Sequence, residues 1–166
     1  MGLLLSAIGA TVVAVLDVTL GPYLAIGSAQ PHLILVLGVI WAIAGGIEQG
    51  MVWAFVGGLV MDALLARPIG STAFALLVVV GAARALLQPL GRVRLLAPII
   101  AVPILSLVYS MLVLVLGSTG QGAGTVANPL GLFLPGVIYD AALGLVLGPL
   151  IVSAHDRRLA VERVDW

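Results

Sequence analysis

The sequence predicts an all-α integral membrane protein, with residues 1–166 forming a single polytopic domain built as a bundle of about six transmembrane helices. Hydrophobic residues make up 62% of the chain and charged residues 8%, whereas soluble domains carry about 25% charged residues. A helix that crosses the hydrocarbon core needs about 20 mostly apolar residues, so a chain of this length has room for roughly six spans and for no sizeable soluble domain. Glycine, proline and short polar breaks separate the apolar runs.

The apolar runs place the six spans, in order, at residues 3–20, 31–45, 51–66, 72–87, 95–117 and 130–154. The first run lacks a basic leader and a cleavage site of the Ala-x-Ala type, so we expect it to be a retained span and not a signal peptide. Spans two and three are short, and the polar turn "GGIEQG" joins them. We expect these two spans to form an antiparallel hairpin.

The arginines predict the orientation of the bundle. Two of the seven arginines lie between spans four and five and three follow span six, at positions 92, 94, 157, 158 and 163. Positive charge in short loops is retained on the cytoplasmic side. With six spans these five arginines share one side, so both termini are predicted to be cytoplasmic. Arg67 is then alone on the external side.

The sequence offers no motif for catalysis or for a cofactor. The net charge is zero and cysteine is absent, which argues against nucleic acid as a partner and excludes thiolate chemistry. The glycine-rich tract 117–129 lacks the lysine of a phosphate-binding loop and is predicted to be an external loop. His32 and His155 are predicted at opposite membrane faces, and His32 has no acidic or histidine partner one helical turn away. We therefore predict a protein that is not an enzyme and holds no cofactor or metal.

Small residues spaced by four mark helix faces that permit close packing, because they let two backbones approach within the bilayer. In span three this face is formed by Gly50, Ala54 and Gly58 and ends at Asp62. Similar faces occur in span two, at Gly38, Ala42 and Gly46, and in span six, at Gly136, Asp140, Gly144 and Gly148. These positions are predicted to bind a partner helix or to hold the bundle together. The alternative is that glycine and alanine are simply common in membrane helices.

Two acids, Asp62 and Asp140, lie within predicted spans, where an isolated charge costs on the order of 3 kcal/mol. Asp62 precedes "RPIG", in which Pro68 and Gly70 break the helix. Its predicted partners are Arg67, backbone donors of that turn, or donors of a bound protein or ligand. Asp140 is predicted to be protonated or to pair with Arg84. A structural clamp and a relay or ligand role both remain open for each acid.

The segment "PHLILVLGVIWAIAGGIEQGMVWAFVGGLVMDALLARPIGSTAF", residues 31–74, resembles the core of the rod shape-determining MreD family of bacterial membrane proteins. The shared pattern is Gly58, Asp62, Pro68 and Gly70, with Pro31 and Gly46 as supporting positions. The resemblance implies a non-enzymatic scaffold of the cell-elongation complex in the bacterial cytoplasmic (inner) membrane. It also implies an MreC-like single-span partner and, through that partner, a SEDS glycosyltransferase, a class B penicillin-binding protein and MreB filaments. Membrane lipid surrounds such a chain.

The same family is similar in fold to the substrate-binding components of energy-coupling-factor transporters, which leaves a vitamin-binding role as the alternative function. Such a component would have a polar, aromatic-lined cavity on its outer side, whereas the chain has only three Trp, three Tyr and three Phe. An ion-coupled carrier would need several acids at one depth, and Asp17, Glu48, Asp62 and Asp140 are predicted at different depths. The sequence therefore favours the scaffold.

Overall fold

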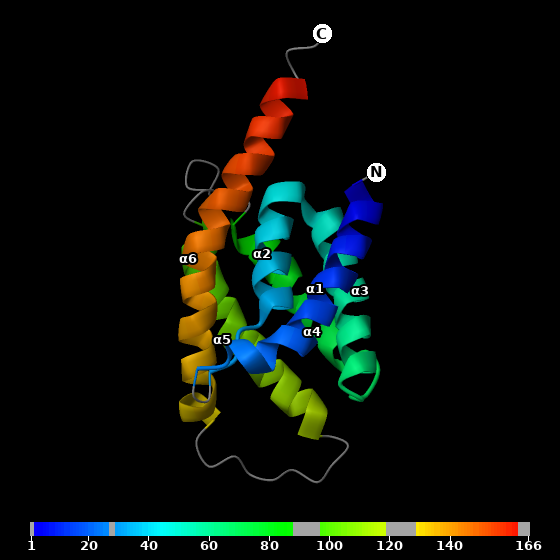
Figure 1. The fold of residues 1–166 in the computed structure, drawn as a ribbon, viewed down its shortest axis with the longest axis vertical. Helices are drawn as coiled ribbons and strands as arrows, with labels where there is room; N and C mark the ends of the chain where they lie inside the picture. The colour runs from blue at the N-terminus through cyan, green and yellow to red at the C-terminus, as the bar shows by residue number, and fades with distance from the viewer. Residues whose placement is uncertain (1, 27–28, 88–96, 119–128, 163–166) are drawn as a thin grey trace.

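The structure is a computed structural model that describes residues 2–26, 29–87, 97–118 and 129–162. This part of the chain forms six α-helices (Figure 1): α1 (Gly2–Leu24), α2 (Leu33–Gly45), α3 (Ile47–Leu64), α4 (Ser71–Leu87), α5 (Ala97–Ser118) and α6 (Pro129–Glu162). Successive helices alternate in direction, so the turn between α3 and α4 lies at the end of the bundle opposite the two termini (Figure 1). The predicted all-helical class is confirmed.

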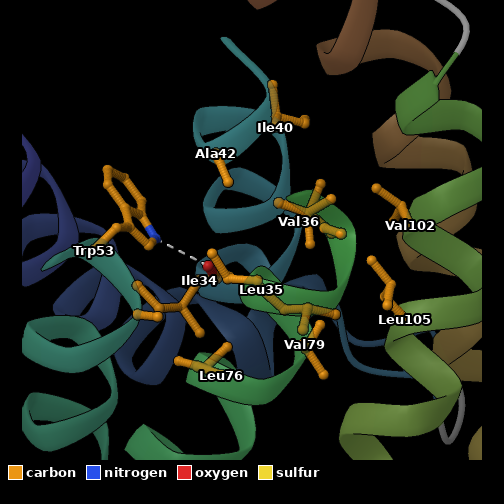
Figure 2. Packing of buried hydrophobic residues seen from close by; sticks show 14 of the residues in the cluster. Ile34, Leu35, Val36, Ile40, Ala42, Trp53, Leu76, Val79, Val102 and Leu105 are labelled. Atoms are coloured by element: carbon orange, nitrogen blue, oxygen red, sulfur yellow. Dashed lines mark hydrogen bonds between the residues drawn. The ribbon is translucent and has the colours of Figure 1, made fainter. Parts of the chain in front are cut away.

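Helix α2 is the centre of the bundle, because it contacts each of the other five described helices. Its sequence, LILVLGVIWAIAG, is apolar on all sides, as expected for a helix surrounded by protein. The side chains of Ile34, Leu35, Val36 and Ile40 are fully buried. Figure 2 shows them between Trp53 of α3, residues of α4 and residues of α5. The α2 helix therefore supplies the middle of the hydrophobic core.

Within the described part of the chain, four helical segments are long and apolar enough to cross a membrane: Gly2–Leu24, Ile47–Leu64, Ala97–Leu116 and Phe133–His155. In contrast, α2 has 13 residues, or about 20 Å at 1.5 Å per residue, against a hydrocarbon core of about 30 Å. The apolar part of α4 is also short. That α2 and α4 complete a set of six spans stays a prediction.

Two helix boundaries differ from those that the sequence predicts. The turn between α2 and α3 is the single residue Gly46, with φ of 96°, because glycine adopts a positive φ without strain. Glu48 and Gln49 therefore belong to α3 and not to a polar turn. Helix α6 continues to Glu162 and projects beyond the other helices (Figure 1). The residues after 154 are mainly good helix formers, so the helix continues beyond the end of the apolar segment.

Candidate functional site

Asp62 satisfies the backbone at the start of α4. One carboxylate oxygen, Oδ2, accepts the Gly70 N–H at 2.8 Å, and Oδ1 accepts the Thr72 N–H at 3.0 Å and the Ser71 hydroxyl at 3.2 Å. The first N–H groups of a helix have no partner within the helix, and a carboxylate there also interacts favourably with the helix dipole. Asp62 is fully buried. Asp62 is predicted to bind Arg67, the backbone donors of the turn, or a bound protein or ligand. In the structure its carboxylate accepts the backbone donors of the turn.

The turn that follows Asp62 owes its shape to "ARPIG", residues 66–70. Ala66 has φ of 50° and Gly70 φ of 96°, and Pro68 has no N–H to continue a helix. The Arg67 N–H donates to the backbone oxygen of Asp62 at 3.0 Å. The Arg67 guanidinium makes no ion pair with the described residues. Arg67 is therefore held next to Asp62 by its backbone, while its side chain stays exposed.

Asp140 binds the N-terminal end of α2 and does not pair with Arg84. Its Oδ1 accepts the His32 N–H at 2.8 Å, and its Oδ2 accepts His32 Nδ1 at 2.8 Å and the Ser106 hydroxyl at 2.5 Å. Arg84 lies in the last turn of α4, at the opposite end of the bundle. The predicted pairing of Asp140 with Arg84 is wrong, because alternating helix directions separate the two residues by most of the bundle's height.

Asp17 of α1 also binds the N-terminal end of α2, where its Oδ2 accepts the Ile34 N–H at 3.0 Å. Three buried acids thus serve the N-terminal ends of the two short helices: Asp17 and Asp140 hold α2, and Asp62 holds α4. A helix end within a membrane protein is tolerated where its free backbone groups are satisfied by protein. The expectation that Asp17, Glu48, Asp62 and Asp140 all lie at different depths is wrong for the three buried acids, because both short helices begin at the same end of the bundle. Glu48 lies in the first turn of α3, at the opposite end.

His32 is the functional residue that reasoning from the sequence missed. Its partner Asp140 is 108 positions away, so no local spacing rule finds it. The grouping of His32, Asp140 and Ser106 contains the residue types of a hydrolase triad in a different order. In a triad the imidazole bonds to the serine hydroxyl, whereas here the Ser106 hydroxyl donates to the carboxylate. The arrangement therefore fixes α2, α5 and α6 relative to one another and does not activate a nucleophile.

A cavity of about 670 Å³ lies beside these helix ends, and of the three acids only Asp17 lines it. Its polar and aromatic lining comes from α1, α4, α5 and α6, from the turn between α3 and α4 and from the segment before α2, and includes Asp17, His32, Arg67, Tyr109 and Phe133. The rings of His32 and Tyr109 meet edge to face with centroids 5.6 Å apart. A third of the His32 side chain remains accessible. The cavity lies at the end of the bundle where the turn from α3 to α4 is found.

The small residues singled out in the sequence lie against neighbouring helices of the same chain. A Cβ at Gly58 would stand 2.2 Å from Ala73 Cα, one at Gly50 2.6 Å from Ala42 Cβ, and one at Gly144 3.0 Å from the Val102 side chain. Ala54 is fully buried. At Gly136 the nearest atom would be the Gln30 oxygen at 3.5 Å, an ordinary contact. The helix interfaces that these residues form are intramolecular, and their role toward a partner stays a prediction.

Comparison with known proteins gives a match to a family. Residues 2–153 match the model of the family described as rod shape-determining protein MreD. No curated protein and no solved structure matches the chain. The expected similarity in fold to substrate-binding components of energy-coupling-factor transporters is therefore not confirmed and stays a prediction.

Proposed function

This chain belongs to the MreD family of rod shape-determining proteins, and we propose that it acts there as a non-enzymatic membrane scaffold that binds an MreC-like single-span partner. Through that partner it supports peptidoglycan synthesis by a SEDS glycosyltransferase and a class B penicillin-binding protein, along MreB filaments. Its site of action is the bacterial cytoplasmic membrane, with both termini on the cytoplasmic side.

The observation that carries this proposal is the family match over nearly the whole chain, which gives the role in rod shape determination. The geometry supports a binding role over catalysis within the described residues. The buried carboxylates of Asp62 and Asp140 are engaged by backbone N–H groups and neighbouring side chains. A general acid or base needs a carboxylate within reach of a substrate proton, and these two acids stabilise helix ends instead.

The partner's helix has two exposed faces on which to pack. The candidate spans in α1 and α6 are the least buried of the four, with 22% of each window buried against 39% for that in α3. Both helices present large apolar side chains outward, such as Val12 on α1 and Leu145 on α6. Helix association in lipid depends on close van der Waals packing. We therefore expect the partner to contact the outer face of α1 or of α6.

Co-purification of an MreC-like single-span protein with the tagged chain tests this proposal. Val12→Trp and Leu145→Trp add bulk to exposed sites that are 52% and 54% accessible, so both variants should fold like the parent and elute as the parent does. One of them should lose the partner. Gly144→Leu is a poor probe, because it would disturb the contact with Val102 inside the chain. The proposal is wrong if the parent chain captures no such partner. If both variants retain the partner, it does not pack on the outer face of α1 or of α6.

A small-molecule-binding component of a transporter remains the second candidate, and the cavity is the observation that favours it. His32, Tyr109 and Phe133 give this cavity the polar and aromatic lining that such a role requires. The two functions differ in what the purified chain does alone. A transporter component would bind a water-soluble, vitamin-like solute tightly without any partner protein, whereas a scaffold needs no such solute.

A further inference from the structure

The cavity carries two opposite charges that are not paired with each other. We propose that it binds an amphiphile whose headgroup contains an anionic group, held by Arg67, and an ammonium group, held by Asp17. Phosphatidylethanolamine has this chemistry. The inference rests on the cavity itself and does not depend on the scaffold role proposed above.

The other acids at this end of the bundle, and His32, already have partners. Asp62 accepts hydrogen bonds from the first residues of α4. Asp140 and His32 are hydrogen-bonded at 2.8 Å, and the Ser106 hydroxyl also donates to Asp140. A ligand therefore has little to gain from these groups, since each is held by protein contacts that it would have to break. The charges left to recognise a ligand are those of Asp17 and Arg67.

Asp17 and Arg67 both line the cavity, yet the described residues contain no ion pair between them. Asp17 is buried, with 7% of its surface accessible, and its Oδ2 accepts the backbone N–H of Ile34, while the backbone N–H of Leu33 also interacts with the carboxylate. Neutral N–H donors compensate a buried carboxylate only in part, since charges within membrane proteins usually pair with an opposite charge. An ammonium group placed in the cavity would supply that charge together with N–H donors.

Arg67 provides the complementary site for an anion. A guanidinium binds phosphate or carboxylate oxygens through two parallel N–H groups, which makes it selective for such groups. Arg67 is also the arginine that the sequence predicts to be alone on the external side, where positive residues are disfavoured. The backbone bond from its N–H to Asp62 keeps it at the mouth of the cavity. Binding of an anionic headgroup would explain why an arginine stands at position 67.

The remaining walls indicate that the ligand also has an apolar part. The cavity of about 670 Å³ lies in the range of sites that enclose whole organic ligands and is far larger than a headgroup needs. Its apolar lining comes from α1, α3, the turn after α3, α5 and α6, at Val18, Met61, Leu65, Val113, Leu114 and Phe133. A lining that combines opposite charges with this much apolar surface suits a ligand that has both a charged headgroup and hydrocarbon, as a lipid has. A small free zwitterion would leave these apolar walls uncovered.

Native mass spectrometry of the full chain released from lipid nanodiscs tests this inference. The nanodiscs contain equal parts of dioleoyl phosphatidylethanolamine, phosphatidylcholine and phosphatidylglycerol. We expect one phosphatidylethanolamine to be retained per chain in preference to the other two lipids, because phosphatidylcholine lacks N–H donors for Asp17 and phosphatidylglycerol lacks the cation. Equal retention of the three lipids would overturn the proposal.

Charge variants assign the retained lipid to the cavity. Arg67→Gln should lower retention of phosphatidylethanolamine tenfold or more, and because Arg67 is exposed this variant should fold normally. Arg84→Gln, at the opposite end of α4, is the matched control and should retain the lipid. Asp17→Asn should also abolish the preference over phosphatidylglycerol. If Arg67→Gln retains the lipid like the parent, the proposed site is wrong.

Soluble phosphoethanolamine distinguishes the two sources of this headgroup. If soluble phosphoethanolamine displaces the lipid at concentrations comparable to those at which the lipid itself binds, the headgroup alone accounts for binding. The ligand is then a water-soluble zwitterion. If it fails to displace the lipid at millimolar concentration, the apolar part is needed and the ligand is a membrane lipid. Displacement by soluble phosphoethanolamine would overturn the proposed amphiphile, whereas failure to displace the lipid supports it.

Discussion

Gly58→Ala should destabilise the protein strongly, because the backbone of α4 lies directly against this residue of α3. A Cβ at position 58 would lie 2.2 Å from Ala73 Cα and 2.6 Å from Ala73 N. Ordinary van der Waals contact begins at 3.4 Å. Both neighbouring atoms belong to the backbone, so no side-chain rotation relieves the clash. The two helices must separate by about 1 Å.

The cost of that separation has two parts. Overpacking of a well-packed interface costs about 1–3 kcal/mol. The shift also acts on the bonds from Asp62, one turn further along α3, to Gly70 and Thr72, which are 2.8 and 3.0 Å long. Lengthening either bond by about 1 Å breaks it, and a buried N–H without a partner costs about 1–3 kcal/mol. Against this, alanine favours a helix over glycine by about 1 kcal/mol. We expect a net loss of about 1–5 kcal/mol.

Gly81→Ala is the matched control, since it makes the same chemical change in the neighbouring helix α4. No atom lies within 4 Å of a Cβ at position 81. Only the gain in helix propensity remains, about 1 kcal/mol in favour of the folded state. The assay is unfolding in mixed micelles titrated with SDS, followed by circular dichroism. If Gly58→Ala and Gly81→Ala shift the free energy of unfolding equally, then Gly58 does not pack against the backbone of Ala73 as the structure has it.

Two further predictions concern Asp62 and the topology. In the same assay, Asp62→Asn should lower the free energy of unfolding by about 1–2 kcal/mol and Asp62→Leu by about 2–4 kcal/mol. The reason is that the asparagine oxygen still accepts one N–H of α4, while leucine accepts none. Equal stability of the parent and both variants would contradict the capping role. Since the chain has no cysteine, Ile69→Cys should react with an impermeant thiol reagent in intact cells and Glu48→Cys only after permeabilisation. The reverse pattern would invert the orientation.

The all-helical class was predictable because composition alone determines it, and the family resemblance was predictable from residues 31–74. The helix ends were predictable where glycine and proline mark them, as at Pro68 and Gly70. The place of α2 at the centre was not, since an apolar run of 13 residues reads equally well as a short span. Its central position becomes visible only from the helices that surround it.

The candidate site was only half predictable, for a physical reason. Asp62 and its donors lie within ten positions of each other, so the local sequence indicates a helix break with an acid beside it. The bonds of Asp17 and Asp140 to α2 span 17 and 108 positions. Such contacts follow from the packing of whole helices and leave no spacing signal. The cavity, which depends on all of these contacts, was therefore not predictable either.

The same two acids connect the outer surface of the bundle to its centre. Asp17 belongs to α1 and Asp140 to α6, the two helices with the most exposed apolar faces. Each acid holds the N-terminal end of α2, through Ile34 and His32 respectively. A partner helix that packs on α1 or α6 therefore contacts a helix that is hydrogen-bonded to α2 beside the cavity. A shift of either outer helix would therefore act on these hydrogen bonds, beside the place where His32 and Asp17 line the cavity.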